Sequence, residues 1–269
     1  MQMQTDFLTD LRARLDSDAQ VRAAWLAGSF GRGNADRYSD IDLHLLLADV
    51  DAFRASARDW LGSLRPLVLY KLLFDGQMIN ALTDEGLRID IWLHGEAPVL
   101  DPAAVDVLLD RDGVLRLDAP PAAPPDPAQV ANSLLAQIEE FWRCVSLLPT
   151  VIGRNELLVS FMGLYVELGI VTDILMAGYG AQRERGVKVL NPYLGDERRG
   201  ELEAALQLNG LNAESLVMAH MALAGVVREH GPLIAERYGF TYPATLEEAV
   251  LRYVASELHE LEENAIERG

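Results

Sequence analysis

Cysteine and lysine are scarce in this 269-residue chain, and each scarcity narrows what it can bind. The single cysteine, Cys144, has no partner in the chain for a disulfide or a thiolate metal cluster. Only two of the 23 basic residues are lysines, Lys71 and Lys188, and the net charge is −18. A chain this acidic repels a long polyanion, so we expect no nucleic-acid partner. A neutral or cationic small molecule suits it better.

The sequence also lacks a long uncharged apolar run and a secretory signal. Its most apolar stretch, residues 157–179, is interrupted by Glu167 and Asp173, which argues against a membrane span. The first ten residues are polar and acidic, without the apolar core of a signal peptide, so we expect a cytoplasmic protein. With 50% apolar residues the chain can bury one large core or two modest ones.

A proline-rich segment divides the sequence in two. Residues 119–127 read APPAAPPDP, a composition that favours a stiff, extended connector. We therefore predict one domain over residues 1–118, a linker over 119–127 and a second domain over 128–269.

The hydrophobic patterns differ on the two sides of this linker. Extended patterns at 21–28, 38–47, 66–74, 77–82 and 87–93 mix with two helical ones before it, whereas helical patterns at 128–148, 154–178, 196–208, 212–238 and 245–266 follow it. The helix at 154–178 is apolar nearly all round, which predicts a buried central helix. The expected fold is α+β: a mixed β-sheet with helices on one face, then an all-α helical bundle.

Two aspartates lie close together in residues 25–47, which read WLAGSFGRGNADRYSDIDLHLLL. Because side chains alternate along a strand, Asp40, Asp42 and His44 share one face and the leucines take the other. Carboxylates held this close repel each other unless a cation or open water lies between them. A hard divalent cation with oxygen ligands is the usual solution.

A second strand pattern, LRIDIWLH at 87–94, places Asp90 on its polar face. If the two strands are neighbours, Asp90 joins Asp40 and Asp42. Three converging carboxylates can hold two metal ions about 3.5–4 Å apart, one on a triphosphate and one on the attacking hydroxyl. In-line phosphoryl or nucleotidyl transfer needs this arrangement more than a covalent nucleophile.

A glycine turn precedes the aspartates. Gly28 and Ser29 follow an apolar strand, so their backbone N–H groups and the Ser29 hydroxyl can face phosphate oxygens. Arg32 lies close by in sequence. Lys71 and Lys188 are further candidates for the triphosphate, as compact positive charges.

The segment GSFGRGNADRYSDIDL, together with Asp90 in RIDIW, resembles the signature of the DNA polymerase β-like nucleotidyltransferase superfamily. The chain looks most similar to the antibiotic nucleotidyltransferases, especially the lincosamide type, through this core, an LYK strand and a helical C-terminal half. The resemblance covers the first domain well and the second loosely, best in LIAERYGFTYPATLEEAVLRYV.

This resemblance implies a reaction and its participants. It makes Asp40 and Asp42 metal ligands, Ser29 a triphosphate contact, and Asp90 a third ligand or the general base. It implies Mg²⁺, two ions in all, and an NTP donor, usually ATP, whose AMP passes to a hydroxyl of a lincosamide- or aminoglycoside-type antibiotic. The signature leaves the acceptor open, so a protein or another metabolite is the alternative.

The helix at 154–178 offers candidate acceptor contacts. Glu156 and Glu167 fall on one helical face with small residues, and either could contact an amine-bearing acceptor or serve as its base. A carboxylate paired inside the bundle is the competing interpretation. A monomer and a homodimer are both compatible with the sequence.

Two other functions compete. Arg252 and His259 form an R-x6-H pattern like that of HEPN-type ribonucleases, which are often encoded beside minimal nucleotidyltransferases; the acidic charge suits RNA poorly. A non-catalytic sensor of nucleotide is the other alternative, and the complete set of carboxylates argues against it.

Overall fold

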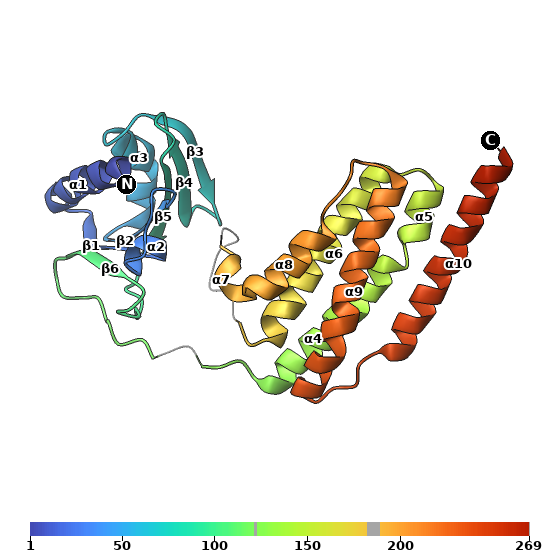
Figure 1. Cartoon of the computed structure of the whole chain (residues 1–269). Helices are drawn as coiled ribbons and strands as arrows, with labels where there is room; N and C mark the ends of the chain where they lie inside the picture. The colour runs from blue at the N-terminus through green and yellow to red at the C-terminus, as the bar shows by residue number, and fades with distance from the viewer. Residues whose placement is uncertain (121–122, 182–188, 269) are drawn as a thin grey trace. The chain divides into compact units, whose positions relative to one another are not determined.

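The computed structural model describes residues 1–120, 123–181 and 189–268, with the backbone alone for 261–268. The chain divides into two compact units, Met1–Ala123 and Pro124–Gly269 (Figure 1). The division falls inside the proline-rich segment 119–127, and Pro127 is already the first residue of a helix.

The first unit is built on a six-stranded sheet (Figure 1). Its elements are α1 (Gln2–Ser17), β1 (Val21–Leu26), α2 (Gly28–Gly31), β2 (Ile41–Leu47), α3 (Val50–Gly62), β3 (Leu67–Leu73), β4 (Met78–Thr83), β5 (Arg88–His94) and β6 (Asp106–Asp110). The strands lie in the order β3-β4-β5-β2-β1-β6. Because β2 and β5 run parallel and their other neighbours antiparallel, the predicted mixed sheet is confirmed.

Helices α1 and α3 cover one face of this sheet. Phe7 and Leu11 of α1 and Phe53 of α3 are fully buried against the apolar side chains of the strands. The Trp60 indole donates a 2.8 Å hydrogen bond to Asp18, which fixes α3 to the turn between α1 and β1. This apolar layer determines which strand residues point the other way.

The opposite face carries the polar strand residues and is covered at one end by the chain that follows β5. There Ala23, Trp25 and Leu46 pack with Leu100 and Leu115. The other end of this face holds the predicted carboxylates.

One strand of the sheet, β6, was not predicted. Its sequence DVLLD is five residues long, has an aspartate at each end and shows no alternation. It is a strand because it pairs antiparallel with β1, with Leu109 opposite Ala24. Such pairing is a tertiary effect that a short sequence window does not contain.

The second unit is helical throughout its described residues. Its elements are α4 (Pro127–Val145), α5 (Leu148–Gly153), α6 (Leu157–Gly178), α7 (Asn191–Leu194), α8 (Asp196–Ala205), α9 (Ala213–Tyr238) and α10 (Ala244–Arg268). The predicted all-α bundle is confirmed, and the short helices α5 and α7 add to the five predicted segments. Helix α6 begins at Leu157 rather than at residue 154, because Asn155 adopts a left-handed φ of 55° that separates it from α5.

Helix α6 is less buried than its sequence predicts. It packs against α4 and α9, yet Leu158, Met162 and Tyr165 are 68%, 67% and 75% exposed. The prediction of a buried central helix was wrong for this side, since apolar composition does not say which sides of a helix have neighbours. Among the described helices α6 alone is long and apolar enough to cross a membrane, and a third of that window is buried in the unit.

Candidate active site

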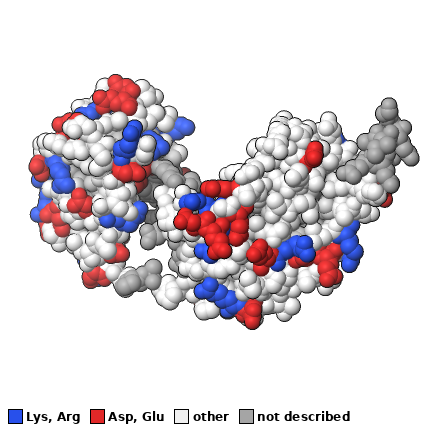
Figure 2. Space-filling view, in the orientation of Figure 1, with Lys and Arg blue, Asp and Glu red and all other residues white. Residues whose placement is uncertain are grey.

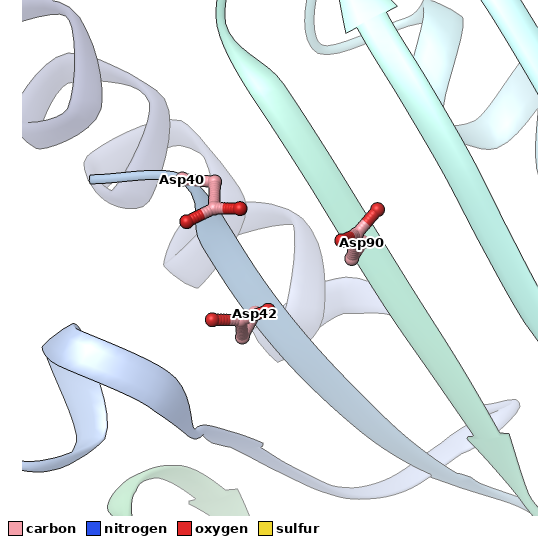
Figure 3. A group of neighbouring side chains, drawn as sticks. All are labelled: Asp40, Asp42 and Asp90. Carbon is pink, nitrogen blue, oxygen red and sulfur yellow. The ribbon is translucent and has the colours of Figure 1, made fainter. Parts of the chain in front are cut away.

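Three aspartates meet at one end of the polar face of the sheet. Asp42 of β2 lies directly opposite Asp90 of β5 in the parallel register, and Asp40 immediately precedes β2. One oxygen from each carboxylate lies within 4.8 Å of the other two. Figure 3 shows the three side chains projecting from the same side of these neighbouring strands.

Strand alternation fixes this arrangement. Ile41, Leu43, Ile89 and Ile91 are fully buried on the helix-covered face. A register slip of one residue would move the carboxylates into that core and expose the apolar side chains, so the buried face holds the acidic cluster in place. The expected pairing of the strands that carry Asp42 and Asp90 is present, since β2 and β5 are neighbours.

The strand that carries Asp42 begins at Ile41, later than the predicted residue 38. The preceding residues form a turn, in which the Asp36 carboxylate accepts hydrogen bonds from the Tyr38 N–H and the Ser39 hydroxyl. Gln4 of α1 donates to the backbone carbonyls of Arg37 and Ser39 at 3.0 and 3.3 Å. These bonds anchor the chain just before Asp40.

Gly28 lies directly against the Asp42 carboxylate. Its φ is +61°, a left-handed conformation, and a Cβ built on it would overlap the Asp42 side chain. The Ala27 N–H also donates to the Asp42 carbonyl at 2.9 Å. Gly28 and Ser29 open the short helix α2, where N–H groups have no acceptor within the helix, so this turn can present donors beside the carboxylates.

Asn80 is a site residue that the sequence analysis missed. It lies opposite Asp90 on β4, and its amide donates a 2.6 Å hydrogen bond to Asp90 Oδ1. The bond orients the carboxylate and leaves its second oxygen for another partner. One signal was present, since Asn80 is the lone amide in the apolar strand MINALT.

Lys71 is the next residue in a row of cross-strand partners that includes Asp90 and Asn80. It is exposed on β3 with Asn80 as its backbone partner, so the row runs Asp42, Asp90, Asn80, Lys71. Two strand spacings put the Lys71 backbone about 10 Å from that of Asp90, a span that a lysine side chain and a triphosphate can bridge. Arg32 is exposed at the C-cap of α2, and Lys188 lies outside the described residues.

A layer of aromatic and imidazole rings adjoins the carboxylates. His44 Nδ1 and His94 Nε2 lie 2.9 Å apart, and the Trp25 ring stacks on both imidazoles at 5.2 Å. Burial lowers the pKa of His94, which keeps its imidazole neutral at physiological pH. Among the described residues, the acidic group that could hold a metal is Asp40, Asp42 and Asp90, so His44 serves in this layer.

The two predicted acceptor residues lie in the second unit and are not brought together. Glu156 is exposed at the N-cap of α6. Glu167 is 1% exposed and its Oε2 lies 2.7 Å from His220 Nδ1. Eleven helical residues separate them by about 16 Å, so they cannot hold the same group of a small acceptor.

The residues of the ribonuclease pattern are exposed on α10. Arg252 lies 3.8 Å from Glu248, an ordinary surface pair one helical turn away, and His259 lies two turns further along the helix. Neither belongs to the acidic site of the first unit.

In-line transfer of a nucleotidyl group needs the charge of a triphosphate neutralised and its phosphates oriented, and a carboxylate cluster beside a donor-bearing turn provides for both. The protein is a nucleotidyltransferase. A family model described as streptomycin adenylyltransferase matches residues 1–257, so the chain belongs to that family. The prediction of an enzyme and the resemblance to antibiotic nucleotidyltransferases are confirmed, whereas a lincosamide acceptor stays a prediction.

Two solved structures resemble the chain over most of its length. An aminoglycoside 6-adenyltransferase from Bacillus subtilis is 16% identical, with 94% of this chain and 97% of that one covered and a TM-score of 0.44. A nucleotidyltransferase-like protein from Exiguobacterium sibiricum 255-15 is 12% identical, with 99% and 92% covered and a TM-score of 0.36. No curated protein matches the chain significantly.

Proposed function

We propose that the protein is an Mg²⁺-dependent adenylyltransferase that moves AMP from ATP to a hydroxyl group of an aminoglycoside antibiotic. The observation that carries this proposal is the meeting of Asp40, Asp42 and Asp90 within 4.8 Å. The family supplies the adenylyl donor and names streptomycin, an aminoglycoside, as the acceptor class.

The three carboxylates fit magnesium by their chemistry and spacing. Mg²⁺ takes oxygen ligands at about 2.0–2.1 Å, so two oxygens across one ion lie about 4.2 Å apart. The 4.8 Å limit on the three oxygens is close to that separation. When bound, Mg²⁺ neutralises the triphosphate charge and lowers the pKa of an attacking hydroxyl.

The residues around the cluster then have distinct tasks. The N–H groups of Gly28 and Ser29 and the Ser29 hydroxyl donate to phosphate oxygens, and Arg32 and Lys71 add positive charge. The acceptor oxygen forms a bond to the α-phosphorus as the bond from that phosphorus to the bridging oxygen breaks, which releases pyrophosphate. In this proposal Asp90 accepts the hydroxyl proton, and a glutamate of the helical unit is the alternative base.

Charge favours an aminoglycoside over a neutral acceptor. The chain carries −18, and a polycationic amine is attracted to such a surface while a nucleic acid is repelled. Glu156, exposed at the start of α6, is the better candidate for contact with an amine, because Glu167 is already paired with His220. We keep both residues as predictions.

A pyrophosphate-release assay tests the proposal. The protein is given each of the four NTPs with streptomycin, other aminoglycosides, lincosamides and simple hydroxyl metabolites, with Mg²⁺ or with EDTA. We expect release with ATP, Mg²⁺ and an aminoglycoside. Pyrophosphate release that persists in EDTA contradicts the requirement for Mg²⁺. Release with a lincosamide or a metabolite, but with no aminoglycoside, contradicts the proposed acceptor class.

Replacing Lys71 should weaken ATP binding. Lys71→Ala removes a positive charge from the row that leads to Asp90, so we expect the KM for ATP to rise about tenfold with kcat within a factor of about three. Lys71→Arg keeps the charge and should lie close to the wild type. Steady-state kinetics in ATP measure both, and an unchanged KM in Lys71→Ala removes this residue from the nucleotide site.

Replacing Asn80 should weaken the response to magnesium. Asn80→Ala removes the bond that orients Asp90, and loss of such a supporting group lowers metal affinity by about 10–100-fold. We expect the Mg²⁺ concentration for half-maximal rate to rise by about tenfold or more. Asn209→Ala, which truncates an exposed amide in the second unit, is the control. Equal magnesium curves for both variants contradict the role of Asn80.

A further inference from the structure

One side of helix α6 is apolar and exposed. We call the α6 face the side chains of Leu158, Phe161, Met162, Tyr165 and Val166, which are between 46% and 75% exposed. Together they present several hundred Å², the size at which an apolar patch on a monomer marks an interaction site. They follow one another along a single helix, so the patch is continuous.

This face is also free of charge in a strongly acidic protein. Between residues 155 and 172 the charged side chains are Glu156, at the helix start, and Glu167, which is buried against His220. In Figure 2 the charges of the second unit gather over α7 and α8 and over the lower ends of α4 and α10, whereas the surface near α5 and the upper ends of α6 and α9 is almost uncharged. Two copies carrying −18 each repel elsewhere, so an uncharged face is where they can meet.

A hollow adjoins the α6 face at Val166. Its volume is ≈230 Å³. Most of its lining is apolar, including Leu147, Val151, Val159 and Val166, and its one basic lining residue, Arg143, is paired with Glu140. Gly163 adds no side chain to the wall, which widens the hollow. Its size suits a large apolar side chain rather than water alone.

The polar groups at the bottom of the hollow satisfy one another. His220 Nδ1 lies 2.7 Å from Glu167, and its Nε2 lies 3.1 Å from the Ser160 carbonyl oxygen. The Ser160 hydroxyl also lies 3.2 Å from Nε2, so both ring nitrogens of His220 have polar partners inside the unit. Because these buried groups already have partners, the hollow favours an apolar occupant.

Gly169 continues the stripe one turn beyond Tyr165. It is exposed, and a Cβ built on it would meet no atom within 4 Å. A glycine inside a helix costs about 1 kcal/mol relative to alanine, and the described packing offers no reason for it here. The stripe 158, 162, 165, 169 has the three- and four-residue spacing with which two helices interlock, and a glycine lets their backbones approach.

We propose that the α6 face is the interface of a homodimer, in which two α6 helices pack about a two-fold axis and each hollow receives an apolar side chain of the other copy. A stable interface buries about 800 Å² on each partner and has an apolar centre. The α6 face and its hollow can form the apolar centre of an interface of this area. This proposal is independent of adenylyl transfer.

A lipid bilayer suits the same face less well. To span a membrane, α6 would have to leave α4 and α9 and carry Glu167 into hydrocarbon. To lie on an anionic surface it would need basic residues along the helix beside its apolar side chains, and residues 155–181 contain no lysine or arginine, Arg154 being the nearest before them.

Light scattering coupled to gel filtration tests the dimer. The full chain should have twice its 29.7 kDa mass at about 100 µM protein, far above a micromolar Kd. Met162→Glu and Tyr165→Glu each place a charge in the interface and should weaken the dimer by at least about 100-fold. Leu233→Glu, at a 56% exposed position towards the other end of α9, should leave it unchanged.

Three outcomes overturn the proposal. They are a monomeric wild type at that concentration, dimers that persist in both glutamate variants, and equal dissociation in Leu233→Glu. Circular dichroism melts should show that every variant folds. Sedimentation with phosphatidylcholine vesicles tests the alternative occupant, a lipid bilayer. If the wild type is a monomer that sediments with the vesicles and Met162→Glu does not sediment, the α6 face binds a membrane and not a second copy.

Discussion

Asp42→Asn should reduce kcat/KM by at least about 10³-fold at saturating Mg²⁺. Asp42 faces Asp90 across the parallel strand pair and contributes one of three oxygens within 4.8 Å. An amide has nearly the same shape but carries no negative charge, so the cluster loses affinity for the metal while the strand keeps its packing. Single-turnover measurements of AMP transfer give the size of the loss.

Metal binding can be followed separately from catalysis. ATP with Mg²⁺ should raise the melting temperature of the wild type by several degrees, because a ligand at 100 times its Kd adds about 2.7 kcal/mol of stability. In Asp42→Asn this shift should disappear. A variant that loses turnover but keeps the full shift would place Asp42 in the chemical step and not in metal binding.

The control for this variant is Asp59→Asn. Asp59 is exposed on α3, on the covered side of the sheet, and its replacement changes the net charge by the same amount. We expect unchanged kinetics. If Asp42→Asn also stays within about tenfold of the wild type, the three carboxylates are not a catalytic metal site.

The carboxylate cluster could be predicted because it depends on local geometry. Alternation along IDLHLLL and RIDIWLH puts Asp42 and Asp90 on the face away from the buried isoleucines and leucines. Because both apolar faces must be buried in the same core, few registers of the two strands are possible. The fold class followed from the same patterns. The match to the family, over residues 1–257, then identifies the chemistry.

Other parts of the site depend on contacts between distant segments. The bond from Asn80 to Asp90 and the partnership of His44 with His94 join separate strands. The register of β4 against β5 could not be inferred from residue patterns, so the position of Asn80 opposite Asp90 could not be predicted. The sides of α6 that lack neighbours were hidden for the same reason, since the pattern reports hydrophobicity and the fold decides exposure.

Gly28→Ala should lower kcat/KM by about 100-fold, with a loss of about 1–2 kcal/mol in the free energy of unfolding. The added methyl would lie 2.9 Å or less from the Asp42 carboxyl group, so either the carboxylate turns away from Asp90 or the turn shifts. Either movement separates the phosphate-binding turn from the acidic cluster. The left-handed φ of 61° adds a backbone cost that any L-residue meets there.

Gly33→Ala separates these two effects. Gly33 has a φ of 70°, and a Cβ on it would meet nothing within 4 Å, so this variant bears the backbone cost without the collision. It should lose about 1 kcal/mol of stability and keep its activity within a factor of about three. If both alanine variants lose activity equally, the turn acts through its flexibility and not through its contact with Asp42. A double-mutant cycle adds a second test, because Gly28→Ala should cost little further activity once Asp42→Asn has removed the negative charge that the collision displaces.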